Sequence, residues 1–179
     1  MKRKNRMMIF VVVLSVVFGN SEKSLAYNVT PHGWRTSKIT YRYESYASTR
    51  AKNYITKGAN IWRNRNLDAK LSASSNAMVS CSDTNQDTDW DGIVYFEKDT
   101  TMKIRLSGTM YLNRAGKTWK NNAALQSVAV HEFGHVLGLD ECKDKVIMNP
   151  YTWGENSRYG TYKLIIPQTD DINGVNSLY

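Results

Sequence analysis

Two histidines four residues apart constrain this chain more than any other feature. They enclose a glutamate in the run His131-Glu132-Phe133-Gly134-His135. Residues i and i+4 share one face of an α-helix, so a helix here directs both imidazoles toward one metal ion. Zinc binds imidazole nitrogen at about 2.0–2.1 Å, and a catalytic zinc keeps one position for water. The spacing therefore predicts a helix that carries two zinc ligands, with Glu132 placed beside them as a base.

These residues can also be interpreted as ordinary helix residues, because a lone histidine on a helix is usually structural. Only 3 histidines occur in the chain, however, and two of them fall at the zinc spacing. Two ligands do not complete a zinc site, so a third must follow. Gly138 allows the chain to leave the helix sharply, and the carboxylates of Asp140 and Glu141 come directly after it. Either carboxylate can supply the third ligand.

The hydrophobic pattern predicts a single α+β domain. Helices are expected from Ser48 to about residue 66, over 121–139, and from Asp170 or Asp171 to Leu178. Strands are expected at 38–43, within 67–82, and at 92–96, 103–106 and 109–113. The aromatic-rich segment 151–169 is expected to be an irregular loop.

The first 26 residues predict a signal peptide. Basic residues precede an apolar run of 12 residues at 7–18, and Ser24-Leu25-Ala26 is a small-x-small pattern suited to cleavage before the next residue. A membrane-spanning helix needs about 20 apolar residues, so cleavage is favoured over an anchor. We therefore expect residues 27–179 to be secreted to the extracellular space, with no stable membrane insertion.

Net charge gives little indication of a partner once the signal peptide is set aside. The whole chain has 24 basic and 16 acidic residues, and residues 27–179 keep 19 and 15, a net charge near +4. Such a mild excess does not predict binding to nucleic acid. The length suits one compact domain with its own core, and a monomer is expected.

Two further patterns predict a disulfide and a calcium loop. In an oxidising compartment, Cys81 and Cys142 are expected to form a single disulfide. Asp87, Asp89 and Asp91 have the opening spacing of a calcium loop, although lysine stands at the twelfth position, where such loops carry glutamate. A solvated acidic turn explains the same residues equally well.

The zinc motif and its continuation resemble a known family. The segment 128–140 resembles the active-site helix of the matrixins, the matrix-metalloproteinase family of the metzincins, and 146–150 and 168–179 resemble its Met-turn and C-terminal helix. The strand and helix expected at 38–43 and 48–66 stand where a matrixin has its first strand and helix. The resemblance implies a metzincin-like single domain, with a twisted, mostly parallel sheet and a backing helix.

The same resemblance implies an activity and residue roles. It implies a zinc metalloendopeptidase with one catalytic zinc ion and polypeptide substrates. Glu132 would act as general base toward the attacking water, and Met148 would form an apolar floor beneath the metal. Asp170 or Asp171 would tie the last helix to the Met-turn.

The chain departs from the matrixin pattern at one metal position. The family extends its motif to HExxHxxGxxH, and the third histidine would fall at position 141, which is Glu141 here. Some secreted bacterial metzincins carry a carboxylate there, so the resemblance implies Glu141 as third ligand, ahead of Asp140 and then Cys142. Because a carboxylate is anionic, it should make zinc a weaker Lewis acid. Lower activity or a higher pH optimum is expected.

A catalytically silent metzincin-fold binding module is the alternative function, with Glu141 as the first sign of lost activity. The presence of Glu132 favours the enzyme, because inactive relatives of enzymes often lose the base. Substrate preference is not predicted. In matrixins the wall of the main side-chain pocket follows the Met-turn as Pro-x-Tyr, whereas Pro150 is followed here by Tyr151-Thr152-Trp153.

Overall fold

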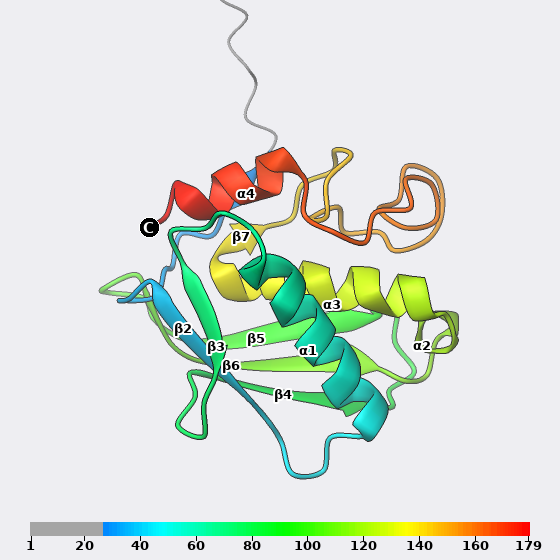
Figure 1. Cartoon of the computed structure of the whole chain (residues 1–179), viewed down its shortest axis with the longest axis horizontal. Helices are drawn as coiled ribbons and strands as arrows, with labels where there is room; N and C mark the ends of the chain where they lie inside the picture. Colours follow the sequence, from blue (N-terminus) through cyan, green and yellow to red (C-terminus); the bar gives the residue numbers. More distant parts are fainter. Residues whose placement is uncertain (1–26) are drawn as a thin grey trace, which may run out of the picture.

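The computed structural model describes residues 27–179, so the predicted signal peptide at 1–26 lies outside the described residues. Strands and helices alternate only in part along the chain (Figure 1). The strands are β1 (Asn28–Val29), β2 (Lys38–Tyr43), β3 (Lys70–Ala73), β4 (Val79–Thr84), β5 (Gly92–Asp99), β6 (Ile104–Asn113) and β7 (Leu139–Asp140). The helices are α1 (Thr49–Arg63), α2 (Lys117–Lys120), α3 (Asn122–Leu137) and α4 (Thr169–Asn176).

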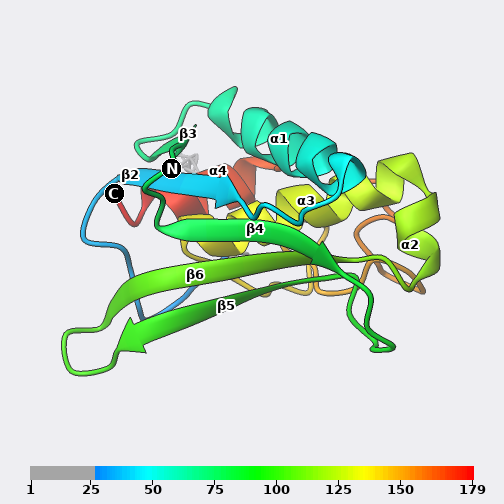
Figure 2. The ribbon, with the colours of Figure 1, turned by 90° about the horizontal axis from the view of Figure 1, so that it is seen from below.

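Five strands form one mixed sheet in the order β3-β2-β4-β6-β5. All neighbours pair in parallel except β5, which runs antiparallel to β6 at one edge. Helices α1 and α3 lie side by side on the same face of this sheet (Figure 2). The predicted α+β class with a mostly parallel sheet and a backing helix is confirmed.

The strand pattern differs from the sequence prediction at two places. The segment 67–82 holds two strands, β3 and the start of β4, because a turn separates them. The strands expected at 103–106 and 109–113 are one continuous strand, β6. Gly108 lies within β6 opposite Phe96, and a Cβ there would come within 3.1 Å of the Phe96 ring. The glycine makes room for that ring and does not end the strand.

Helix α1 forms where its cap and apolar stripe predict it. The Ser48 hydroxyl accepts a hydrogen bond from the backbone N–H of Ala51, which satisfies one of the free donors of the first turn. Its buried face packs on α3, and Gly58 lets the two helices approach closely. A Cβ on Gly58 would lie 2.8 Å from the backbone oxygen of Ala129. The indole N–H of Trp62 donates to the Val130 carbonyl at 2.7 Å, which ties α1 to α3 directly.

Helix α3 is the most deeply buried helix of the described chain. The Asn121 side chain caps its start by accepting hydrogen bonds from two backbone N–H groups. Gly138 ends it with a φ of 110°, a left-handed conformation that glycine adopts without strain, as expected from its position in the sequence. The turn sends the chain into β7, which pairs antiparallel with β1. The last turn of α3 and the residues after it are therefore fixed by the N-terminal strand.

The predicted Cys81–Cys142 disulfide is wrong. Within residues 27–179 the structure forms no disulfide, and both cysteines are buried. Cys81 lies in β4, in the middle of the sheet, whereas Cys142 follows β7, and Figure 1 places β4 and β7 on opposite sides of α3. The Cys142 thiol donates instead to Asp144 Oδ2 at 3.4 Å.

Candidate active site

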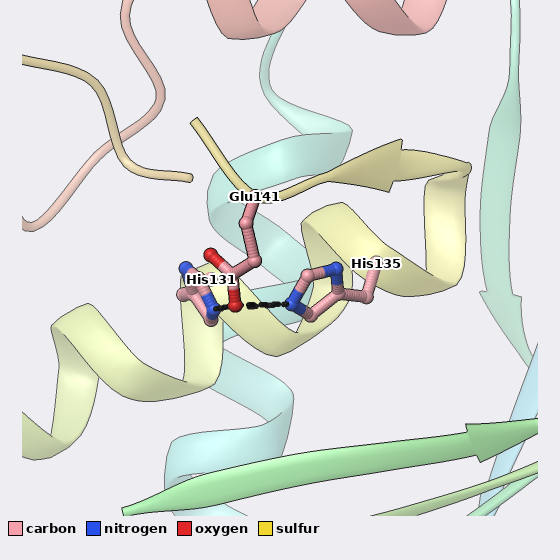
Figure 3. Close-up of side chains that lie close together, drawn as sticks. All are labelled: His131, His135 and Glu141. Carbon is pink, nitrogen blue, oxygen red and sulfur yellow. Dashed lines mark hydrogen bonds and ion pairs between the residues drawn. The ribbon is translucent and has the colours of Figure 1, made fainter. Parts of the chain in front are cut away.

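His131, His135 and Glu141 converge on one point. One carboxylate oxygen of Glu141 lies 3.4 Å from His131 Nε2 and 3.3 Å from His135 Nε2. The two Nε2 atoms are 3.1 Å apart, and Figure 3 shows the carboxylate reaching in between the two rings. The ligand atoms of these three residues all lie within 4.8 Å of one another. A single ion can therefore touch all three.

The hydrogen bonds of the two rings leave their Nε2 atoms available to a metal. His131 Nδ1 donates to the carbonyl of Ile147 at 2.9 Å, and His135 Nδ1 donates to that of Leu139 at 3.0 Å. A neutral ring that donates from Nδ1 carries a lone pair on Nε2. Two such lone pairs repel each other at 3.1 Å unless a cation lies between them. Two nitrogens bound tetrahedrally to zinc would be about 3.3 Å apart, so the donor set fits zinc closely.

Glu141 reaches this point because β7 and β1 hold its backbone. The Asn28 side chain donates to the Glu141 carbonyl at 2.7 Å, and the Glu141 N–H donates to Asp140 Oδ1. The structure brings Glu141 to the two histidines, whereas Asp140 and Cys142 are not members of that group within residues 27–179. Glu141 is also the accessible member, with 43% of its side chain exposed.

Burial and mutual charge shift the pKa values of the three groups. Burial lowers the pKa of His131 to about 4, and the charge of Arg158 adds to this effect. Burial acts against a charged His135 as well, but the hydrogen bond with Glu141, the negative charges of Glu132 and Glu141 and the hydrogen bond to the Leu139 carbonyl together raise the pKa of His135. Burial alone would raise the pKa of Glu141, yet its contacts with the two imidazoles hold it well below its usual range. The site thus keeps an ionised carboxylate and an unprotonated His131, the forms that bind metal.

Glu132 lies one residue beyond the first histidine and is 2% exposed. Its Oε2 atom is buried and has no hydrogen-bond partner. Burial raises the pKa of Glu132 to about 7, although the charges of His135 and Arg158 act in the opposite direction. The start of β5 packs against it, since a Cβ on Gly92 would lie 2.6 Å from Glu132 Oε1. A buried carboxylate with an oxygen that makes no hydrogen bond is the arrangement expected of a general base, because that oxygen can accept a proton from water.

The Met-turn, residues 146–150, packs against α3 next to the two histidines. Met148 is buried there and lies so close to Gly134 that a Cβ on that glycine would clash with it. Asp171, in the first turn of α4, accepts hydrogen bonds from the backbone N–H groups of Ile147 (3.0 Å) and Met148 (3.2 Å). The prediction that Asp170 or Asp171 ties the last helix to this turn is confirmed for Asp171.

An open cleft of about 520 Å³ runs past these groups. The edge strand β5 lines it with Gly92, Ile93, Val94 and Phe96, and the segment 150–153 lines it as well. His131, Glu132, His135 and Glu141 all line the cleft. The three grouped side chains and Glu132 therefore share one solvent-accessible space.

The family model described as Matrixin matches residues 33–179. The chain belongs to the matrixin family. This matrixin carries the family's two histidines and glutamate at His131, Glu132 and His135, and a glutamate where the family motif has its third histidine.

Individual relatives match over different lengths. Matrix metalloproteinase-C of Caenorhabditis elegans is 22% identical over 171 residues, which cover 82% of this chain and 28% of that protein. Neutrophil collagenase of Homo sapiens is 43% identical over 70 residues, covering 36% of this chain and 14% of the collagenase. The matrixin spans less than a third of the length of these curated relatives.

Among solved structures, a chain of the structure titled "GM1 bound form of the ECX AB5 holotoxin" superposes with a TM-score of 0.55. It is 16% identical, and the match covers 79% of this chain and 80% of that chain. At that identity the likeness concerns the fold alone.

Two arginines near the site were not predicted from the sequence. Arg105, on β6, donates to the carbonyls of His135 (2.6 Å) and Val136 (3.2 Å), and its guanidinium lies 3.8 Å from the centre of the Phe96 ring. It holds the last turn of α3. Arg158 is 2% exposed and lines the cleft from the long loop after the Met-turn. A single arginine in a strand or loop follows no periodic pattern, so the sequence offered no signal for either.

The acidic loop before β5 is organised by an amide. The Asn113 side chain donates to the Gln86 carbonyl at 2.8 Å and to Thr88 Oγ1 and the Trp90 carbonyl at 3.1 Å. The amide therefore links three positions along the loop, from residue 86 to residue 90. Within residues 27–179 the one group of three or more acidic, histidine or cysteine side chains that could share a metal is that of His131, His135 and Glu141. The calcium site at Asp87, Asp89 and Asp91 stays a prediction.

Loss of the Asp171 carboxylate is expected to destabilise the Met-turn. Asp171 Oδ2 accepts from the N–H groups of Ile147 and Gln168, and Oδ1 accepts from that of Met148. In Asp171→Asn one oxygen becomes an NH₂ donor, so at least one buried N–H loses its acceptor. We expect the free energy of unfolding in urea to fall by about 1–3 kcal/mol. Asp170→Asn is the matched control, because it removes a carboxylate from the same helix turn; equal losses in both variants would contradict this role of Asp171.

Proposed function

We propose that this matrixin is a secreted zinc-dependent endopeptidase in which His131, His135 and Glu141 hold one zinc ion. One observation carries the proposal: three metal-binding groups meet in an open cleft beside a buried glutamate that has an unused oxygen. Matrixins are zinc metalloendopeptidases, so family membership supports the same conclusion.

The residues of the chain divide the chemistry between them. When bound here, zinc supplies Lewis acidity, which polarises a carbonyl group and makes water a stronger acid. Glu132 accepts the proton of the attacking water and later delivers it to the nitrogen of the leaving amine. Its raised pKa of about 7 suits both steps near neutral pH. Met148 and Asp171 keep the turn beneath the histidines in place without touching the substrate.

An extended polypeptide is the substrate that the cleft favours. Strand β5 pairs only with β6 in the five-stranded sheet, so its other edge carries unpaired backbone groups. That edge forms the cleft wall from Gly92 to Phe96. An extended peptide can add to such an edge by backbone hydrogen bonds, which bind many sequences alike. A folded substrate would first have to expose an extended segment.

Location outside the cytoplasm is part of the proposal. The basic start, the apolar run at 7–18 and Ser24-Leu25-Ala26 support a signal peptide at 1–26, with 27–179 as the catalytic domain. Within residues 27–179 we find no helix that combines the length and the apolar character needed to cross a bilayer.

Metal removal tests the proposal directly. The purified protein is expected to cleave unfolded casein, a chelator is expected to stop cleavage, and added zinc is expected to restore it. Mass spectrometry of the products should locate cuts inside the chain and not only at its ends. Cleavage that persists in excess chelator would contradict zinc dependence. Zinc uptake with no cleavage across a broad pH range would favour the alternative, a silent metzincin-fold binding module.

A further inference from the structure

A second cavity, of about 470 Å³, lies beside β3, away from the cleft. Strand β3 is one edge of the five-stranded sheet, whereas the cleft follows β5 at the other edge (Figure 2). The lining of this cavity contains no acidic and no aromatic side chain. Half of its eight lining residues are cations, namely Lys38, Arg63, Arg65 and Lys70. The cavity is therefore a concentration of positive charge that is separate from the candidate active site.

The fold provides these four cations with no ion-pair partner. Within residues 27–179 no carboxylate oxygen lies within 4.0 Å of any of them. Asp68 is the one acidic residue of the segment 63–72, and it does not line the cavity. Arg63 donates to the side chain of Asn60 at 3.1 Å, which is a neutral acceptor. The positive charge of the cavity is thus available to an anionic group from another molecule.

Two of the cations face each other across neighbouring strands. Lys38 in β2 and Lys70 in β3 are direct partners in the parallel register, and both are exposed. Like charges at directly opposite positions repel and destabilise a sheet. An anion bound next to both ammonium groups would offset that repulsion. The register therefore opposes stability in the free protein and favours a negatively charged ligand.

The cavity also reaches the free edge of β3. Lys70, Leu71 and Ser72 follow one another in this strand, and all three line the cavity. Because successive side chains of a strand point to opposite faces, a cavity that touches three in a row extends around the edge of the strand. Strand β3 pairs only with β2 in the described sheet, so this edge carries backbone donors and acceptors without a strand partner. An extended peptide can add to such an edge by backbone hydrogen bonds.

The lining distinguishes between classes of anionic partner. Without an aromatic ring, the cavity offers no surface on which nucleic-acid bases stack. None of the exposed large hydrophobic side chains of the described residues belongs to it, so it offers no group that inserts into a lipid bilayer. A sulfated polysaccharide carries the charge but has no peptide backbone with which to pair with β3. Cations beside a free strand edge therefore favour a peptide with acidic side chains.

We propose that this cavity is a docking site for an extended acidic peptide segment, which pairs with the free edge of β3 while its carboxylates contact the four cations. Carboxylates at every second position of such a segment lie on one face and can reach the paired lysines together. The site is separate from the cleft, so its occupation does not require cleavage. Where the endopeptidase function holds, the acidic segment belongs to a part of the substrate other than the cleaved bond.

Titration calorimetry with two capped peptides tests the charge requirement. In one peptide glutamate alternates with valine or threonine, and in the other glutamine replaces every glutamate; both are added to Glu132→Gln protein, so that cleavage does not interfere. Each exposed ion pair strengthens binding by up to about fivefold, so we expect the glutamate peptide to bind tighter by about tenfold or more. This difference should shrink as salt is added. Equal binding of both peptides, or binding of neither, would overturn the proposal and leave Lys70 only the role of keeping other strands off the edge.

Variants locate the binding at β3. The double variant Lys38→Gln/Lys70→Gln is expected to bind the glutamate peptide about tenfold more weakly. Because the repulsion between the two lysines is removed as well, the variant should unfold at no lower urea concentration than the unaltered chain. Lys98→Gln/Lys120→Gln is the matched control, since it removes two exposed lysines from β5 and α2, and its affinity should change by less than about twofold. An equal loss in both double variants would overturn the proposal, because the peptide would then respond to net charge alone.

Backbone methylation separates a peptide site from a site for any polyanion. Two further glutamate peptides are N-methylated at the odd or at the even positions, which keeps their charges and removes the N–H donors of one edge at a time. We expect one of the two to bind about tenfold more weakly than the unmodified peptide, because it loses its hydrogen bonds to β3. Equal binding of all three peptides would overturn the proposal, and displacement by dextran sulfate would then assign the cavity to a sulfated polysaccharide. Neither result bears on zinc-dependent cleavage, which is measured at the other edge of the sheet.

Discussion

Replacement of Glu141 by glutamine is expected to weaken zinc binding by about 10²–10³-fold. Complete zinc sites of small proteins gain roughly 10–16 kcal/mol from all their ligands together, so one ligand accounts for about 3–4 kcal/mol. Glutamine keeps the size and one oxygen of Glu141 but loses the charge that draws it between His131 and His135. Competition with a zinc-binding dye measures the change, and cleavage should fall in parallel unless zinc is supplied in excess.

Asp140→Asn is the matched control for this experiment. Asp140 is the neighbouring carboxylate and was the second choice for the third ligand on sequence grounds, yet its oxygen accepts the Glu141 N–H and it does not join the metal group. We expect its zinc affinity to stay within a few-fold of the wild type. A large loss in Asp140→Asn with little loss in Glu141→Gln would show that the third ligand has been assigned to the wrong carboxylate.

Glu132→Gln is expected to lower kcat by about 10²–10⁴-fold, the usual contribution of a general acid–base residue. Glutamine fills the same buried space but cannot accept the proton of the attacking water. Zinc content should stay at the wild-type level, because Glu132 is not among the grouped ligands. Turnover of a fluorogenic peptide and metal analysis of the same sample measure both quantities.

Glu97→Gln provides the comparison for Glu132. Glu97 lies on β5 but is exposed, and it accepts a hydrogen bond from Ser107 outside the cleft. Neither its zinc content nor its kcat is expected to change by more than about twofold, as for most surface substitutions. Retention of more than a tenth of wild-type turnover by Glu132→Gln would remove Glu132 from the role of base.

Most features that could be predicted from the sequence depend on patterns of residues that are close together in the chain. The zinc spacing within α3, the Ser48 cap and the stop at Gly138 each depend on residues within a few positions of one another. The helix cap expected at Asp170 or Asp171 is wrong, because Gln168 caps α4 and Asp171 lies three residues further on. The link from one of these two aspartates to the Met-turn came from the family resemblance, and it is made by Asp171. The choice of Glu141 as third metal ligand required the family resemblance, because the spacing alone did not distinguish it from Asp140.

Features that depend on distant parts of the chain could not be predicted. The disulfide failed because composition counts cysteines but does not place them: Cys81 lies in β4 and Cys142 follows β7, and within residues 27–179 no disulfide joins them. The acidic loop is shaped by Asn113, which lies beyond β5 in the sequence. Arg158 reaches the cleft from an irregular loop whose path follows no repeating pattern.

Titration of the metal-free protein with zinc tests the central claim most directly, with bound zinc and peptide cleavage measured in the same samples. We predict that cleavage rises in proportion to zinc and reaches its plateau at one ion per chain, and that Glu132→Gln takes up the same single ion without cleaving. Zinc uptake by the wild type with no cleavage at any pH, or full cleavage before zinc is added, would contradict the account.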